Sequence, residues 1–362
     1  MKKISKSAGP DKRSLEKPPF DKPPLEKRAR IVKAKPSTHS EADLALRAAW
    51  LSYVGGYTQA QIAERLKVSR MKVHRLVAMA HDMGAVQVFI DGSPEALLQL
   101  EDQLREKMGL EDCVLVPSVA EDAANPEINL GRAAAHYLKS RLESSEVNVL
   151  GLGWGRSLSE MVNCLPDMDC SDVRMVPVLG SVVRKMALNP YDVIHRLVDR
   201  TGGEGYLLPV PLFADTEEHR DVLMAQRSVQ DVMRIAVDAD LTMVGLGAVP
   251  DQGHSLLMEL GELDERDAAS LREVGAAAEI LGQFLDANGQ RVECEINQRT
   301  LGLSLDQLRH HHIVAVAGGM EKVNAILAVL RSGLLKGLIT DENVARRILE
   351  LWDDSGDKVQ QG

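Results

Sequence analysis

The chain has 362 residues, of which 44% are apolar, a size that suits two folded domains and a composition typical of soluble globular proteins. It contains no uninterrupted apolar run of about 18 residues and no apolar leader, which argues against a membrane partner and a signal peptide and favours the cytoplasm. The cysteines form no Cys-x-x-Cys pair, so we expect reduced, structural thiols at Cys113, Cys164, Cys170 and Cys294.

The net charge of −10 is unevenly distributed along the chain. Residues 1–40 hold 12 basic and 4 acidic residues, residues 41–90 hold 6 and 4, and the remainder holds 25 and 45. A basic front end joined to an acidic body indicates a protein whose N-terminal part faces nucleic acid.

The first 110 residues predict an arm, a small helical domain and a connecting helix. Residues 1–40 are rich in Lys and Pro, which predicts a disordered basic arm that either touches DNA phosphates weakly or is a solvated tail. Residues 41–92 form the predicted helical domain, whose first helix follows the spacing of Leu44, Ala48, Leu51 and Val54. Within it, residues 85–90 alternate like a short strand and residues 91–94 indicate a turn. Residues 93–110 predict an amphipathic linking helix.

The window from Gly56 to Val77 has the pattern of a helix-turn-helix motif. Thr58 predicts an N-cap with Gln61 as its capping-box partner, Lys67-Val68 predicts a tight turn, and Ser69 predicts the cap of a second helix. The side chains expected to face inward are Ile62, Ala63, Leu66, Val73, Leu76 and Val77.

The outward side chains of this window are candidate DNA contacts. The start of the second helix in such motifs faces base edges and phosphates in the major groove, and Arg can pair with guanine. An ordinary helical hairpin with a solvated basic face is the alternative interpretation. The candidate DNA-binding residues are Thr58, Gln59, Ser69, Arg70, Met71, Lys72, His74 and Arg75.

Residues 111–352 alternate between short β-like runs and helical runs, which predicts an α/β domain with a parallel sheet and helices on both faces. The predicted strands are 113–116, 147–151, 173–178, 241–245 and 313–317. The predicted helices are 130–142, 157–164, 192–200, 218–225, 228–237, 271–274 and 323–331. Residues 353–362 are expected to be a tail.

Residues 147–158 indicate a strand, a glycine-rich turn and the start of a helix. Gly153 and Gly155 let the backbone approach a ligand, and Arg156 and Ser157 with the helix amides can hold an anion. A dinucleotide-binding loop is the competing interpretation, but the glycines follow GxGxGRS instead of GxGxxG, and no acidic residue follows at the usual distance. We therefore expect neither NAD nor another cofactor.

Three further segments follow predicted strands. The loops after Val178 and Val244 are rich in small residues and either line the same crevice or pack tightly. Lys322 follows a Gly-Gly turn, where it either meets a phosphate over helix amides or lies in solvent. The run from His310 to His312 is not expected to bind a metal, because three adjacent side chains cannot converge on one ion.

Together these segments resemble the SorC family of sugar-binding transcriptional regulators. The resemblance spans residues 44–350 and is carried by Thr58–Val77, GLGWGRSL (151–158), ADLTMVGLGA (239–248), VGAAAEILGQFLDANG (274–289), RTLGLSLDQLR (299–309), VAVAGGMEKVNAI (314–326) and GLITDENVA (337–345). It implies a helix-turn-helix domain and an effector domain similar in fold to glucosamine-6-phosphate deaminase and ribose-5-phosphate isomerase. It also implies operator DNA and a sugar-phosphate or polyol-phosphate effector as partners, and a homo-oligomer that is a tetramer, in other words a dimer of dimers.

The resemblance also assigns roles to single residues. Ser157, Gly180 and Ser181 correspond to phosphate or hydroxyl contacts, Glu279 to an acceptor of hydroxyl hydrogen bonds, and Lys322 to the cation beside the phosphate. The candidate effector-binding residues are Gly153, Gly155, Arg156, Ser157, Gly180, Ser181, Gly247, Glu279 and Lys322.

Three functions remain open at this point. The first is a regulator of a carbohydrate or polyol catabolic operon, controlled by a small effector with or without a phosphate. The second is a phosphosugar isomerase or deaminase with a DNA-binding domain, and the third is an oligomerisation platform without a ligand. No compact acid–base cluster adjoins the glycine loops, so we expect a regulator and not an enzyme.

Overall fold

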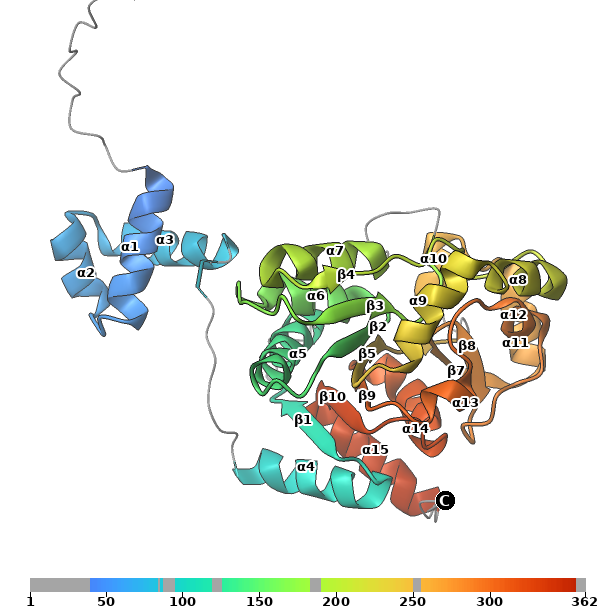
Figure 1. Cartoon of the computed structure of the whole chain (residues 1–362). Helices are drawn as coiled ribbons and strands as arrows, with labels where there is room; N and C mark the ends of the chain where they lie inside the picture. The colour runs from blue at the N-terminus through green and yellow to red at the C-terminus, as the bar shows by residue number, and fades with distance from the viewer. Residues whose placement is uncertain are drawn as a thin grey trace, which may run out of the picture. The chain divides into compact units, whose positions relative to one another are not determined.

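The structure is a computed structural model that describes residues 40–83, 85–86, 95–118, 126–182, 190–249 and 255–355. The expected basic arm, most of the expected strand over 85–90, the turn at 91–94 and most of the tail lie outside these ranges. The chain divides into two compact units, residues 1–77 and 78–362. Figure 1 shows the first as a cluster of helices and the second as a sheet covered by helices.

The helical unit is built from three helices: α1 (Glu41–Tyr53), α2 (Gln59–Leu66) and α3 (Arg70–Asp82). The predicted capping box of α2 is confirmed, because the Thr58 amide donates to Gln61 Oε1 at 2.9 Å and the Gln61 amide donates to Thr58 Oγ1. Lys67 then turns the chain with a φ of 54°. The Lys72 amide donates to the Ser69 hydroxyl, so local hydrogen bonds set both sides of the turn.

The interior of this unit is lined largely by small side chains. α1 packs against α2, and the buried residues of the three helices are Ala45, Ala48, Ala49, Ile62, Ala63, Val73, Leu76 and Ala80. The first helix predicted from the spacing of Leu44, Ala48, Leu51 and Val54 is confirmed; Ala48 is buried, whereas Val54 is the C-cap residue and is 68% exposed. Alanines take the inward positions because small side chains let two helices approach closely.

The α/β unit is organised around a seven-stranded parallel sheet with the order β1-β10-β9-β5-β2-β3-β4. Its strands are β1 (Asp112–Val116), β2 (Val149–Leu152), β3 (Arg174–Pro177), β4 (Glu204–Gly205), β5 (Leu241–Gly245), β9 (Ile313–Val316) and β10 (Gly337–Asp341). All five strands predicted for residues 111–352 in this sheet are therefore confirmed, and β4 and β10 are additions.

Helices cover both faces of this sheet, as expected for parallel strands (Figure 1). One face packs against α5 (Pro126–Glu143), α6 (Arg156–Cys164) and α7 (Pro190–Thr201). The other packs against α4 (Glu95–Met108), α9 (Arg227–Val237), α14 (Val323–Arg331) and α15 (Glu342–Ser355). Side chains of successive strand residues alternate between the two faces, so Leu150 belongs to one core and Val149 to the other. The helix α4, predicted as a linking helix, packs on β1 and α15.

A second, three-stranded antiparallel sheet is formed by β6 (Gly247–Ala248), β7 (Ala276–Ile280) and β8 (Gln283–Asp286). The remaining elements are α8 (Glu217–Met224), α10 (Leu256–Leu260), α11 (Glu265–Glu273), α12 (Glu295–Arg299), α13 (Leu305–Leu308) and the 3₁₀ turn Met320–Lys322. Since β6 follows β5 after a single residue, the small sheet is attached directly to the carboxyl end of a central strand.

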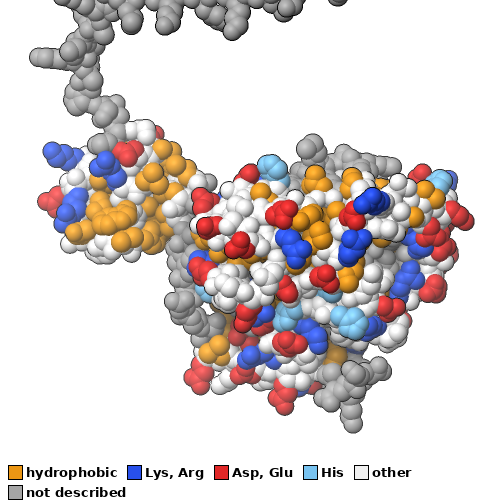
Figure 2. Space-filling model, viewed as in Figure 1, with side chains coloured by type: hydrophobic (Ala, Val, Ile, Leu, Met, Phe, Trp, Pro, Cys, Tyr) orange, Lys and Arg blue, Asp and Glu red, His pale blue; other side chains and the backbone are white. Residues whose placement is uncertain are grey.

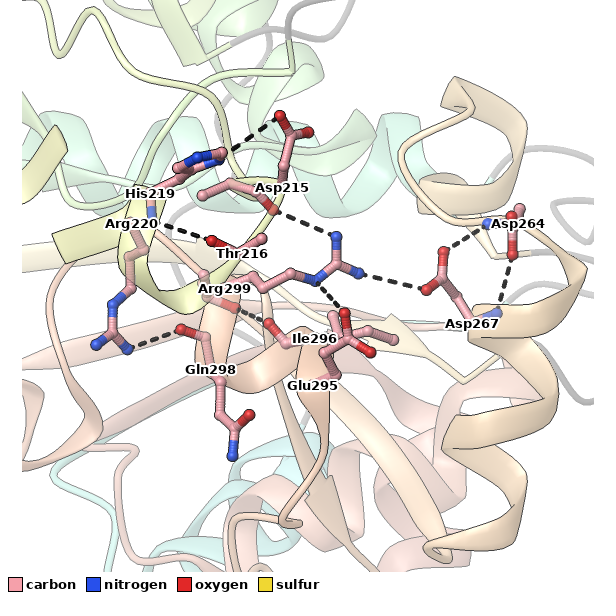
Figure 3. Close-up of polar contacts among 12 residues, drawn as sticks. Asp215, Thr216, His219, Arg220, Asp264, Asp267, Glu295, Ile296, Gln298 and Arg299 are labelled. Carbon is pink, nitrogen blue, oxygen red and sulfur yellow. Dashed lines mark hydrogen bonds and ion pairs between the residues drawn. The ribbon is translucent and has the colours of Figure 1, made fainter. Parts of the chain in front are cut away.

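Arg299 ties three of these elements together beside the small sheet (Figure 3). Its Nη1 donates to the Ala214 carbonyl oxygen at 3.2 Å, just before α8, and its Nη2 donates to Asp267 of α11 at 3.4 Å. Nε lies 3.8 Å from Glu295 within α12. The guanidinium group thus links segments that are far apart in the sequence and fixes this side of the α/β unit.

Candidate functional site

A pocket opens at the carboxyl ends of the neighbouring strands β2, β5 and β9. The pocket encloses about 660 Å³, its open mouth included. It is lined by Trp154, Gly155, Arg156, Ser157, Gly245, Leu246, Gly247, Ala248, Leu256, Glu279, Leu281, Val316 and Lys322. In open parallel sheets this edge of the strands is where ligands bind.

The glycine-rich loop after β2 forms one wall of the pocket. Gly155 has a φ of 134°, which a residue with a Cβ atom avoids, and it directly precedes the first turn of α6. Arg156 and Ser157 begin that helix, and both line the pocket. Because a helix N-terminus presents amide groups and partial positive charge, this wall favours an anionic group.

The small sheet supplies the opposite, acidic wall. Gly247 of β6 pairs with Glu279 of β7, and a Cβ atom at Gly247 would lie 2.4 Å from Glu279 Oε2, so a side chain at this position would displace the carboxylate. Glu279 is buried, and its Oε1 accepts a hydrogen bond from the Gly282 amide at 2.6 Å. Burial raises the pKa of Glu279 to about 7, against the opposing effects of the Gly282 hydrogen bond and the Lys322 charge. The pocket therefore contains a carboxyl group that can accept hydrogen bonds from a ligand.

Lys322 lies where the pocket meets a second, outer chamber. The two chambers share Arg156, Ala248 and Lys322, and the outer one is also lined by Glu127, Val249, Ala276, Ala277, Glu321, Asn324 and Ala325. The Gly-Gly turn before Lys322 is held by Asp341, whose Oδ2 accepts from the Gly319 amide at 2.8 Å. The lysine thus projects from a turn that is anchored to the end of β10.

Arg156 stands at the same junction with its charge already paired. Its Nη2 donates to Glu259 Oε2 of α10, and its Nη1 lies 3.9 Å from Glu127 Oε1 of α5. The side chains of Arg156 and Glu259 are 45% and 42% exposed, so this ion pair lies in contact with solvent. An anionic ligand at this position meets a guanidinium group that has carboxylate partners.

The candidate DNA contacts lie along α2 and α3 in the helical unit. Gln59, Arg70, Met71, His74 and Arg75 are exposed, and Met71 is 78% exposed. Lys72 forms an ion pair with Glu41 at 3.7 Å, while Thr58 and Ser69 act as helix caps. The beginning of α3 therefore presents an outward surface with several basic side chains.

The sequence and the fold of this chain are similar to those of known regulators. Residues 93–350 match the family described as "Putative sugar-binding domain". The erythritol catabolism regulatory protein EryD of Brucella abortus (strain 2308) is 42% identical over 313 residues, which covers 86% of this chain and 97% of that protein. The transcriptional regulator LsrR of Enterobacter sp. (strain 638) is 34% identical over 315 residues, covering 86% and 94%. The full-length sorbitol operon regulator SorC from Klebsiella pneumoniae has a TM-score of 0.66 at 25% identity, covering 84% of this chain and 98% of that one.

The chain belongs to the SorC family of sugar-binding transcriptional regulators. Its relatives are similar over nearly their whole length and are named as regulators, so this SorC-family chain is a transcriptional regulator and not an enzyme. None of the helices in the described ranges is long and apolar enough to span a lipid bilayer.

The pocket of the SorC-family chain brings together six of the nine predicted effector contacts: Gly155, Arg156, Ser157, Gly247, Glu279 and Lys322. Gly153, Gly180 and Ser181 are not among its lining residues. A Cβ atom at Gly180 would lie 2.0 Å from the Pro211 carbonyl oxygen, and Ser181 exchanges backbone hydrogen bonds with Val210 and Leu212. The second glycine loop of the SorC-family chain is therefore packed against the neighbouring segment.

Gly153 serves packing in a similar way. Its amide donates to the Met243 carbonyl oxygen at 2.9 Å, and a Cβ atom there would lie 3.0 Å from Leu281. Sequence reasoning missed the apolar part of the pocket, formed by Trp154, Leu246, Leu256, Leu281 and Val316. Because these side chains are apolar, the sequence predicts them to be ordinary core residues. Only Trp154, which lies within the glycine loop, had a position that indicated the pocket.

The histidine run of the SorC-family chain serves structure. His311 is buried with its Nδ1 3.0 Å from Thr242 Oγ1, whereas His312 Nε2 lies 2.8 Å from Asp112 Oδ2. Across the described part of the chain, no group of three or more His, Cys, Asp or Glu side chains is placed to hold a metal ion.

Proposed function

We propose that this SorC-family chain binds the operator of a carbohydrate or polyol catabolic operon and changes its DNA affinity when a small phosphorylated sugar or polyol occupies the pocket. One observation carries the proposal: a single pocket at the carboxyl ends of β2, β5 and β9 gathers a buried carboxyl group, a helix N-terminus and two cations. The names of two relatives, which refer to erythritol catabolism and to a sorbitol operon, support the same ligand class.

The chemistry of the pocket suits a molecule with hydroxyl groups and one phosphate. Glu279, with Oε2 beside Gly247, accepts hydroxyl hydrogen bonds at the inner end, and Ser157 adds a hydroxyl group. Arg156, Lys322 and the first turn of α6 attract the phosphate at the junction of the two chambers. The packed residues Gly153, Gly180 and Ser181 contribute by shaping the sheet edge behind this pocket.

The helical unit is proposed to read DNA as a helix-turn-helix. The short turn between α2 and α3 and the exposed start of α3 support this assignment. In such a unit Arg70, His74 and Arg75 lie near base edges or phosphates in the major groove, and Met71 can contact a thymine methyl group. Gln59 at the start of α2 lies near the DNA backbone in this proposal. Lys72 contacts a phosphate after its ion pair with Glu41 breaks.

A homo-oligomer of at least two chains follows from the need to read two half-sites with one reading unit per chain, and the family resemblance leads us to propose a tetramer. α1 offers a surface for pairing two copies, since it exposes Leu46, Trp50 and Tyr53, and its C-cap residue Val54 is exposed as well. Figure 2 shows apolar side chains gathered on this unit. We infer as well a fold relation of the α/β unit to glucosamine-6-phosphate deaminase and ribose-5-phosphate isomerase, and a cytoplasmic site of action.

The proposal is tested by titrating the full chain onto a labelled duplex from its own upstream region at low salt. The titration is repeated with a panel of sugar and polyol phosphates and their neutral counterparts, and a thermal-shift screen against the same panel reports binding directly. We expect specific retardation of the duplex and a change in affinity with one member of the panel. Absence of retardation, or a DNA affinity that no binding compound changes, contradicts the proposal.

A further inference from the structure

The mouth of the pocket carries a contact between Arg156 and α10 that the proposed function does not use. Arg156 of α6 donates to the Glu259 carboxylate of α10, and Glu127 of α5 approaches the same guanidinium group at 3.9 Å. The three side chains come from separate elements, so only the assembled fold brings them together. Arg156 also lines both chambers, which places this contact on the path of a ligand.

The carboxyl groups around this junction counteract the two cations that attract an anion. The described lining of the two chambers holds two cations, Arg156 and Lys322, and three carboxyl groups, Glu127, Glu279 and Glu321, to which Glu259 adds a fourth beside Arg156. A phosphate group carries about −1.5 to −2 charges at neutral pH. To bind Arg156 it must take over a guanidinium group that Glu259 already neutralises, whereas a neutral polyol has no such competitor.

We propose that Glu259 is a specificity-determining residue of the effector site, because its carboxylate competes with the phosphate of the effector for Arg156. In this proposal Glu259 does not bind the ligand itself. It acts through Arg156 and sets how strongly a phosphorylated compound is preferred over its neutral counterpart. Glu259 is the stronger competitor because it is hydrogen-bonded to the guanidinium group, whereas Glu127 lies 3.9 Å away. This inference rests on the proposed function, since it assumes that the pocket binds a polyol.

The fold allows Glu259 to be altered without disturbing the core. α10 is attached through Leu257 and Leu260, which are buried, while the Glu259 side chain is 42% exposed. Because solvent screens such an ion pair, the effect of removing the Glu259 charge is modest. We expect the affinity for an anion to rise by about two- to fivefold.

The test measures binding of erythritol 4-phosphate and erythritol to the full chain by calorimetry, in the wild type and in Glu259→Gln. We expect Glu259→Gln to bind the phosphate about two- to fivefold more tightly and to bind erythritol unchanged. Glu273→Gln is the matched control, because it removes the same charge from an exposed position near the end of α11, outside both chambers.

A double-mutant cycle then shows whether Glu259 acts through Arg156. In an Arg156→Gln background, Glu259→Gln should no longer change the affinity for the phosphate. The inference is overturned if Glu259→Gln leaves the affinity for the phosphate unchanged, or if it raises the affinities for both probes equally. It is also overturned if Glu273→Gln raises the affinity for the phosphate as much, or if Glu259→Gln still raises that affinity in the Arg156→Gln background. A wild type that binds neither probe, nor any compound in the wider panel, contradicts the proposed function itself.

Discussion

The two units of this chain reach their structures by different routes. In the helical unit, the hydrogen bonds that shape the turn join residues three apart, Thr58 with Gln61 and Ser69 with Lys72. In the α/β unit, the contacts that shape the pocket join distant residues, such as Gly247 with Glu279 and Arg156 with Glu259. The proposed DNA-facing surface is thus a local product of the sequence, whereas the pocket exists only when the whole sheet is assembled.

This difference determines what a substitution can do. A change at a long-range contact in the α/β unit is expected to affect the stability of that whole unit, because its strands and helices share two continuous cores. A change in the helical unit is expected to remain local. The following predictions test this contrast, from the largest expected effect to the smallest.

Gly180→Ala should destabilise the α/β unit most, by on the order of 3 kcal/mol, because the added methyl group would meet the Pro211 carbonyl oxygen at 2.0 Å. Urea unfolding followed by tryptophan fluorescence measures the loss. Ser181→Ala is the control, since the Ser181 hydroxyl has no hydrogen-bond partner among the described residues and its removal should be nearly neutral. Equal stability of the two variants contradicts the packing role given to Gly180.

Glu279→Gln should remove the part of the pH dependence of the free energy of unfolding that comes from the Glu279 carboxyl group. The pKa of Glu279 is raised on folding from 4.5 to about 7, so its stabilising contribution is complete below pH 4.5 and is lost as the pH rises to about 7. A shift of this size corresponds to roughly 3 kcal/mol. Urea unfolding between pH 4.5 and 7.5 should show the variant gaining that much relative to the wild type. A constant difference between the two proteins across this range contradicts the assignment.

Arg70→Ala should weaken operator binding about 10- to 100-fold while leaving the α/β unit intact, because an Arg–guanine pair contributes about 1–3 kcal/mol. Fluorescence anisotropy with a labelled operator measures the change, and urea unfolding checks the α/β unit. Arg105→Ala, an exposed change on α4, removes the same charge elsewhere. If both variants lose the same affinity, the basic surface of α3 is not the reading surface.

Thr58→Ala should cost the helical unit about 1 kcal/mol, since the Gln61 amide loses its capping acceptor. Hydrogen exchange of the α2 amides reports this loss within the unit. Thr58→Ser keeps the hydroxyl group and should restore most of the protection. If the serine variant exchanges as fast as the alanine variant, the cap is not the source of stability.

Local signals explain how much of the molecule was predictable. The α2 capping box, the Ser69 cap and the five apolar strands follow from patterns within ten residues or fewer, and the structure confirms them. β7 was missed because Ala276–Ile280 is rich in alanine and has no clear period of two, and the second strand of its hairpin, β8, was missed with it. β10 was missed because Gly337 and the polar pair Thr340-Asp341 interrupt a short apolar run.

The residues of the effector pocket were likewise predictable only where a local pattern indicated them. Glycines that face the pocket, such as Gly155, share their sequence signature with Gly180, which packs against Pro211. Only the three-dimensional pairing separates the two. The Glu259 partner of Arg156 could not be found from the sequence, because 102 residues lie between them and no local pattern connects them.

The most direct test is whether a compound bound in the pocket changes the affinity of the chain for its operator. Operator affinity is measured by fluorescence anisotropy for the full chain and for Lys322→Gln, with and without the sugar or polyol phosphate that gives the largest thermal shift. We expect equal affinities without the compound, a changed affinity for the wild type with it, and a much smaller change for Lys322→Gln. A wild type whose operator affinity stays the same at saturating compound would contradict the coupling between the two units.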